Sequence, residues 1–387
     1  MSPSQTYSPF RTVLLREWRR MTSRRLYFGV CIILPLFTLF FMATIFGNGQ
    51  MENIPIGIVD QDNTATSRSI IRNISAVPTF KVTAAREAVQ RKEIYGYLSI
   101  PPKFEQDAIT GQDATLSYYY HYALLSVGGE LMAAFETALA PVSLSPVVMQ
   151  AVALGVEQDQ ITTFLLPVQA SNHPIYNPSL DYSVYLSQPF FFVLFQILIL
   201  LTTVYAIGIE IKFRTVTDWL VAAKGNMVTA ILGKLLPYTI IYILIGWLAN
   251  YVMFGILHIP FQGSWWLMNI MTMLFIIATQ SLGLFLFSLF PAISLIISIV
   301  SMVGSLGATL SGVTFPVPNM YPLVRDASYL FPVRHFTEMM QNMLYGSGGF
   351  TQLWPSAMFL CIFPLLAFSL LPHLKRAIES HKYENIK

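Results

Sequence analysis

The sequence predicts a polytopic α-helical membrane protein with six membrane-spanning helices, both termini in the cytoplasm, and an extracytoplasmic α/β domain inserted between helices 1 and 2. Three observations predict this fold class. The 387 residues are 54% hydrophobic and only 11% charged, whereas soluble domains contain about 25% charged residues. The 90 residues between Lys234 and Arg325 contain no Asp, Glu, Lys or Arg, as expected of segments for which ionisable groups are costly. Residues 48–185 hold most of the acidic residues, which favours an aqueous setting for them.

Residues 1–25 are predicted to form an amphipathic helix on the cytoplasmic surface of the membrane. Ser8 and Pro9 suit the N-cap and the first helical position. Apolar residues recur on one face among several arginines, at Phe10, Val13, Leu14, Trp18 and Met21. Apolar burial and anionic lipid would hold such a helix at the interface of the bilayer.

Six apolar runs are long enough to cross a bilayer, which needs about 20 residues per helix. They lie at 26–46, 186–209, 235–257, 264–290, 292–315 and 353–372. We assign residues 26–47 to helix 1, with Pro35 as a kink. A cleaved signal peptide is the alternative for this run, but no small-residue cleavage site follows it. Helices 2–6 fall within residues 186–387.

The orientation follows from lysine and arginine residues in the short flanking segments. Basic residues cluster before helix 1, between helices 2 and 3 at 212–234, and after helix 6 at 375–387. With six helices all three segments lie on one side of the membrane, and we assign that side to the cytoplasm. The short loop at 258–263, on the other side, has no Lys or Arg.

The inserted domain at 48–185 is predicted to alternate strands and helices, which indicates a small α/β domain. Strands are expected at 54–59, 79–82, 95–100 and 114–120, and helices at 64–75, 84–92, 104–110 and 124–156. The acidic run at 60–63 lacks the glycine and distal glutamate of a calcium loop. A strand-to-helix turn explains it better, so no metal site is predicted.

Residues 210–224 are predicted to form a short cytoplasmic helix. Glu210, Arg214 and Asp218 are spaced four residues apart, so they could form alternating ion pairs on one helix face. Two interpretations remain open. The helix could simply lie on the membrane surface, or it could dock a cytoplasmic motor protein.

Residues 316–352, after helix 5, are expected to form a re-entrant or amphipathic segment at the outer surface. A helix at 333–344 would carry Arg334, His335 and Glu338 near the outer interface. These three residues are candidates for an outer gate or a substrate contact. The alternative is that they cap short helices and pair with one another.

The sequence lacks the motifs of several catalytic classes. It has no GxxxxGK[ST] phosphate-binding loop, no HExxH and no GxSxG, and we predict no catalytic, metal-binding or cofactor-binding residues. Nothing in it indicates nucleic-acid binding. The predicted helices lack the acids that an ion-driven transporter usually carries. We therefore expect a partner that hydrolyses ATP. A membrane-embedded enzyme acting on lipids or glycans, and a membrane-anchored scaffold or receptor, are the alternative functions.

Several short motifs in a shared order resemble one known family. They are Arg16-Glu17 followed by Pro35, the stretch Ile56-Gly-Ile-Val-Asp60, Gly233-Lys234-Leu-Leu-Pro237, and Ser311-Gly312 with Phe331-Pro332. In these motifs, over nearly its whole length, the chain resembles the ABC-2 type (type-2 ABC) transporter permeases that carry a large extracytoplasmic domain. One departure is at the cytoplasmic helix, where Glu210 and Thr215 are kept but the family's preceding arginine and its glycine are replaced.

The resemblance implies a permease subunit of an ATP-driven exporter in the bacterial inner membrane. Such a subunit would move an amphipathic, drug-like or lipid-like substrate out of the cytoplasm or the inner leaflet. It would pair with a second permease copy or a paralogue, bind cytoplasmic ABC ATPase subunits that use the ATP, and possess no ATPase of its own. A periplasmic adaptor is a further implied partner. The ATPase-coupling residues would be Glu210, Arg214, Thr215 and Asp218.

Overall fold

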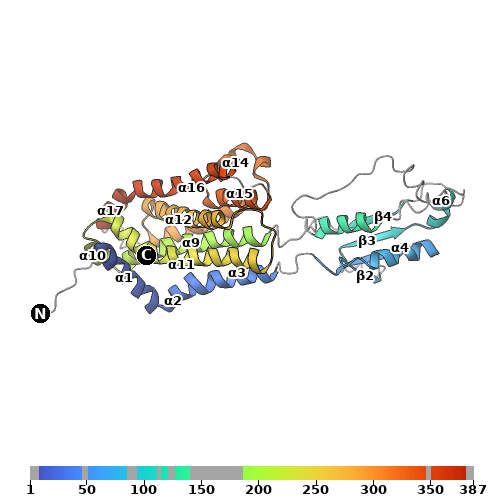
Figure 1. Ribbon diagram of the computed structural model, residues 1–387, viewed down its shortest axis with the longest axis horizontal. Helices are drawn as coiled ribbons and strands as arrows, with labels where there is room; N and C mark the ends of the chain where they lie inside the picture. Colours follow the sequence, from blue (N-terminus) through green and yellow to red (C-terminus); the bar gives the residue numbers. More distant parts are fainter. Residues whose placement is uncertain are drawn as a thin grey trace. The chain divides into compact units, whose positions relative to one another are not determined.

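The computed structural model describes residues 8–45, 51–84, 94–110, 115–120, 127–139, 186–345 and 350–380. The chain divides into two compact units, each described below by itself. Unit 1 comprises Met1–Gly47 and Tyr182–Lys387, and unit 2 comprises Asn48–Asp181. Figure 1 shows that unit 1 is helical and that the strands belong to unit 2.

Unit 1 is a bundle of apolar helices. Its first long helix, Arg25–Ile45, consists of α2 (Arg25–Phe28), η1 (Gly29–Ile33) and α3 (Leu34–Ile45). The other long helices are α9 (Gln188–Lys212), α11 (Met227–Asn250) continued by η3 (Tyr251–Ile256), α12 (Trp265–Leu289), α13 (Ile293–Thr309) and α16 (Phe350–Ser369). Among the described residues, five helices are long and apolar enough to cross a membrane. The α13 helix has 17 residues and is about 25 Å long at 1.5 Å per residue. It is therefore shorter than the hydrocarbon layer of a bilayer, which is about 30 Å thick, and is not one of these five helices.

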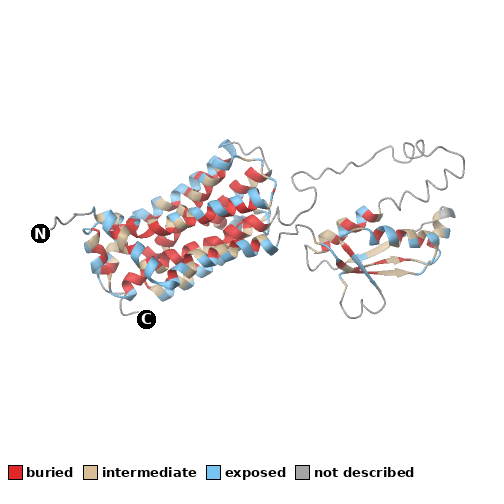
Figure 2. Cartoon of the chain, turned by 60° about the horizontal axis from the view of Figure 1, so that its bottom comes forward, coloured by how far each residue is buried: buried red, intermediate tan, exposed pale blue. Residues whose placement is uncertain are grey.

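The core of unit 1 forms around α9, which packs against α11, α12 and α13. Large aromatic side chains such as Phe191, Phe195 and Tyr242 are fully buried there. Figure 2 shows the buried residues gathered toward the inside of the helical bundle. The outward faces stay apolar but exposed, as at Phe37 and Leu365. An exposed apolar face on a long helix is what lipid contact requires.

Several helix bounds differ from the sequence prediction. The α11 helix begins at Met227, where Asn226 caps it by accepting a hydrogen bond from the Thr229 amide. Lys234 therefore lies inside the helix and not in the preceding loop. The α13 helix ends at Thr309 and not near residue 315. The π-helix η1 interrupts helix 1 just before Pro35, as expected of a proline that removes a helix hydrogen bond.

The predicted helix over 210–224 is wrong in its bounds. The α9 helix continues through Glu210 to Lys212, and a separate helix, α10, covers Val216–Ala222. Between them Arg214 adopts a left-handed backbone conformation with φ of 55°. That break turns the chain, so Glu210 and Asp218 do not share one helix face.

The short helices gather at the two ends of unit 1 (Figure 1). One end, which we call the basic end, holds α1 (Pro9–Ser23), α10 and α17 (Leu371–Glu379). There Lys375 Nζ donates to the Gly225 carbonyl oxygen at 2.8 Å, tying α17 to the α10–α11 turn. The other end, which we call the far end, holds α14 (Pro322–Ser328) and α15 (Pro332–Tyr345).

In the described part of unit 2, the strands form a four-stranded sheet in the order β2-β1-β3-β4. The strands are β1 (Ile54–Asp60), β2 (Phe80–Ala84), β3 (Gly96–Ile100) and β4 (Ser117–Tyr120). The first three are parallel and β4 runs antiparallel to β3. The helices α4 (Ala65–Ser75) and α6 (Phe104–Thr110) connect them, and residues 127–139 are also helical. Most of the predicted helix at 84–92, and of that at 124–156, lies outside the described residues.

The acidic turn of unit 2 caps a helix. Asp60 Oδ1 accepts hydrogen bonds from the amides of Asp62 and Asn63, at 3.0 and 3.1 Å. Thr64 and Ser67 exchange side-chain and backbone bonds in a capping box at the start of α4. These bonds support the strand-to-helix turn that the sequence predicts.

Candidate functional site

The amino-terminal helix α1 carries a buried acid on its apolar face. Val13, Glu17 and Met21 follow one another at four-residue steps and are all buried. The α1 helix packs on α11, and Gly233 allows the close approach, because a Cβ atom there would lie 2.9 Å from Val13 Cβ. This packing brings Glu17 against Lys234, the residue after Gly233.

Lys234 lies between two carboxylates. Its Nζ atom donates to Glu17 Oε2 at 2.6 Å and to Glu210 Oε1 at 2.7 Å, and all three side chains are essentially inaccessible to solvent. Tyr238, one turn further along α11, donates its hydroxyl to Glu17 Oε1 at 2.7 Å. A buried lysine is tolerated only when paired and hydrogen-bonded in this way.

Glu210, near the end of α9, collects further donors. Arg16 Nη2 donates to Glu210 Oε2 at 2.9 Å, and Arg20 and Thr215 also donate to this carboxylate. Arg16 additionally contacts the Thr215 carbonyl oxygen at 3.4 Å. Glu210 thus joins α1, α9, α11 and the segment that leads into α10. We call Arg16, Glu17, Arg20, Glu210, Thr215, Lys234 and Tyr238 the buried ion network.

The α10 helix is fastened to the same place. Trp219 is fully buried, and its indole Nε1 donates to the Ala230 carbonyl oxygen on α11 at 3.2 Å. The Lys234 ammonium lies 5.3 Å from the centre of the Trp219 ring, within the range of a cation–π contact. These two contacts join α10 to α11 and to Lys234, the residue that pairs both buried acids.

Every charged side chain of the buried ion network has a partner of opposite charge. Two carboxylates face three cations and every acid has several donors, so no side chain is poised as a free base or nucleophile. Removing one partner of such a group leaves an uncompensated buried charge, which costs about 3–5 kcal/mol. The network therefore holds the four segments in one arrangement.

The structure separates the four residues that the sequence predicts for coupling. Glu210 and Thr215 belong to the buried ion network. Arg214 and Asp218 are exposed instead, on the turn and on α10. The predicted ion-pair ladder of Glu210, Arg214 and Asp218 is wrong in its first step, because the Glu210 carboxylate is bonded to residues of α1 and α11.

Sequence reasoning did not identify Glu17 and Lys234 as site residues. It placed the arginines of α1 at the lipid surface and counted Lys234 among the charges of a cytoplasmic loop. A signal was present, since Glu17 is the only acid of α1 and shares the helix face of Val13 and Met21. An acid on an apolar helix face indicates a buried cation partner.

The far end holds the three residues predicted as an outer gate. Arg334 Nη1 donates to Glu338 Oε2 at 2.7 Å, and Ser356 on α16 donates to the same oxygen at 2.6 Å. Burial alone would raise the pKa of Glu338, but the Ser356 hydroxyl and the Arg334 charge outweigh it and lower that pKa. His335 is buried with different partners. Its Nε2 atom lies 3.0 Å from the Tyr329 carbonyl oxygen, and its ring stacks on Phe359.

Comparison with known proteins places this bundle among membrane transport permeases. The chain belongs to the ABC-2 transporter family, since the family model described as "ABC-2 family transporter protein" matches residues 25–371. It is similar to the "Inner membrane transport permease YhhJ" of Escherichia coli (strain K12), with 22% identity over 324 residues, covering 79% of this chain and 81% of that protein. The protein of the same name from Shigella flexneri matches equally.

The family match and the similar permeases confirm the predicted resemblance to ABC-2 permeases and the predicted location in the inner membrane. The chain is a multi-pass inner membrane protein and a transport subunit rather than an enzyme. Family membership also implies association with an ABC ATPase subunit.

Proposed function

We propose that this chain is the permease subunit of an ATP-driven exporter, and that the buried ion network transmits the movement of the ATPase to the membrane helices. The observation that carries the proposal is the attachment of α10, a short helix with an exposed face, to α1, α9 and α11 through Glu210, Trp219 and Lys234. The cargo we propose is amphipathic, drug-like or lipid-like, because the cavities between the long helices are lined mainly by apolar side chains.

The orientation in this proposal puts the basic end in the cytoplasm. Exposed lysine and arginine side chains at that end come from α1, from the α9–α11 connection and from α17, and short basic segments stay in the cytoplasm. Lys234 no longer counts toward this charge because it is buried. In the same topology α13 is a sixth, short crossing, both termini are cytoplasmic and unit 2 is extracytoplasmic.

The exposed face of α10 is the proposed docking surface for the ATPase. Val221 is 71% exposed and Phe213, just before α10, is 52% exposed. Asp218 and Lys224 flank them and are exposed as well. An apolar centre with a charged rim is typical of a protein interface.

The proposed partner within the membrane is a second permease copy or a paralogue. The outward face of α13 carries a row of exposed hydroxyl side chains, Ser294, Ser298, Ser301, Ser305 and Thr309. Lipid tails cannot form hydrogen bonds with these hydroxyl groups, whereas small and hydroxyl residues favour close packing of one membrane helix against another. We further propose that unit 2 hands the cargo to a periplasmic adaptor or closes the exit.

Copurification with the ATPase tests the docking surface. Val221→Asp introduces a charge into the apolar centre, so we expect the amount of copurified ATPase subunit to fall about tenfold. The matched control is Val82→Asp on β2 of unit 2, where the valine is 37% exposed and where our topology allows no ATPase contact. Equal copurification with both variants would contradict the proposed surface and side assignment.

A further inference from the structure

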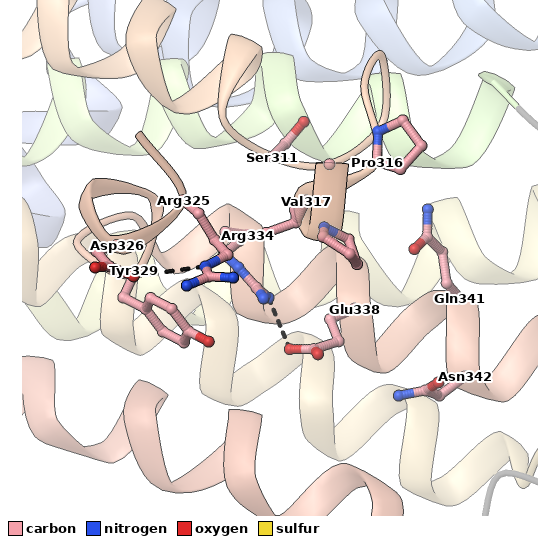
Figure 3. Close-up of a pocket in the computed structure, with 12 residues that line it drawn as sticks. Ser311, Pro316, Val317, Arg325, Asp326, Tyr329, Arg334, Glu338, Gln341 and Asn342 are labelled. Atoms are coloured by element: carbon pink, nitrogen blue, oxygen red, sulfur yellow. Dashed lines mark hydrogen bonds and ion pairs between the residues drawn. The ribbon is translucent and has the colours of Figure 1, made fainter. Parts of the chain in front are cut away.

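The far end of unit 1 contains a polar cavity of about 620 Å³ (Figure 3). It lies between α14, α15 and the segment that follows α13. Gly312 forms part of its wall in a left-handed conformation, with φ of 87°, and a Cβ atom there would lie 2.8 Å from Val317. A cavity of this volume is in the range of small-molecule sites.

Two ion pairs line the cavity, and they differ in how firmly they are held. Arg334 is buried, pairs with Glu338 at 2.7 Å and has its guanidinium 4.9 Å from the centre of the Tyr329 ring. Its Nε atom has no hydrogen-bond partner among the residues that the structure describes. Arg325 is 44% exposed, and its Nε is 3.6 Å from Asp326 Oδ1, beyond hydrogen-bond distance.

The charges of the cavity cancel, which narrows the class of ligand. Two arginines face two carboxylates, and Glu338 stays 46% exposed although Arg334 and Ser356 both bond its Oε2 atom. A lining with no net charge has little attraction for an ion of one sign. Separated exposed groups of both signs, Arg325 on one side and Glu338 on the other, suit a ligand that carries both charges itself.

The surroundings of the cavity are apolar. Large side chains on and beside α14 are among the most exposed of the protein, with Tyr321 and Leu323 at 74% and Leu330 at 68%. Since the chain is a multi-pass membrane protein, lipid is the natural cover for such side chains. The polar cavity thus opens beside a surface suited to acyl chains, as in a site for a lipid headgroup.

We propose that this cavity binds the headgroup of a zwitterionic phospholipid. Arg325, whose own ion pair is loose, receives the phosphate through charge-assisted hydrogen bonds. The ammonium group is held by Glu338, and the acyl chains lie along Leu323 and Leu330. The site requires neither ATP nor a direction of transport, so it can fail or stand independently of the proposed function.

Lipid binding to the purified full-length chain tests the proposal. Native mass spectrometry compares added dioleoyl phosphatidylethanolamine with dioleoyl phosphatidylglycerol. We expect preferential binding of the ethanolamine lipid, and about tenfold weaker binding in Arg325→Gln, because a hydrogen bond to a charged group is lost. The matched control is Arg376→Gln, an exposed arginine on α17 at the basic end. Equal affinity for both lipids, or equal losses in both variants, would overturn the proposal.

Two further arms identify the source of the headgroup and guard against misfolding. Asp326→Asn leaves the cavity with a net positive charge, so we expect binding of phosphatidylglycerol to rise severalfold, a gain that a misfolded variant would not show. Free phosphoethanolamine at millimolar concentration is expected not to displace the lipid. Displacement would overturn the lipid assignment in favour of a soluble zwitterion, and an unchanged lipid preference in Asp326→Asn would overturn the role of the lining charges.

Discussion

Lys234 at the basic end and Arg334 at the far end are both buried cations beside a carboxylate, yet their surroundings differ. The acids that face Lys234 are themselves buried and tied to three helices. The acid that faces Arg334 lies one turn along the same helix and is half exposed beside a cavity. The comparison teaches that a buried, shared charge fixes helices together, whereas an acid that is half exposed beside a cavity stays available for a ligand.

Replacing each of the two buried cations tests this comparison, and we expect it to give the largest changes in the free energy of unfolding. Lys234→Met leaves Glu17 and Glu210 side by side without their shared donor, so we expect a loss of about 3–5 kcal/mol in the free energy of unfolding. Arg334→Met leaves Glu338 partly hydrated, and we expect about 1–2 kcal/mol. The free energy of unfolding of both variants is measured in detergent, with helix content as the signal.

The control for this pair is Lys224→Met, an exposed lysine at the basic end, for which we expect a change within about 0.5 kcal/mol. If Lys234→Met were no more damaging than this control, the buried ion network would not hold the helices together.

The next effect concerns the packing that brings α1 to α11. In Gly233→Ala the added methyl group collides with Val13, so we expect a loss of about 1–3 kcal/mol. Gly29→Ala is the matched control, because nothing lies within 4 Å of its Cβ position. The double variant Val13→Ala/Gly233→Ala should lose less than the sum of its two single variants, by about 1 kcal/mol. Strict additivity in thermal unfolding would contradict the contact.

The membrane helices could be predicted from the sequence because their signal is local. Long apolar runs without charges fix the approximate positions of α9, α12 and α16, and the strands β1 and β3 were predicted within a residue or two. The sequence also predicts the helix at 333–344, and α15 extends it by one residue at each end, to Pro332–Tyr345.

The candidate site could not be predicted in the same way. Glu17 and Lys234 are 217 positions apart, and helical periodicity relates only residues a few positions apart. The break at Arg214 also left no local signal, because a non-glycine residue adopts the left-handed conformation there. With a continuous helix assumed, Glu210 was paired with its neighbours along the chain instead of with its partners in space.

The most direct test of the central claim is the ratio of cargo exported to ATP hydrolysed in the reconstituted complex. Arg16→Gln weakens one bond to Glu210 without removing a buried acid, and Arg19→Gln is the matched control on the exposed side of α1. We predict that ATP hydrolysis continues in both variants while Arg16→Gln lowers the ratio about tenfold. The same ratio in Arg16→Gln, Arg19→Gln and the unaltered protein would contradict the account.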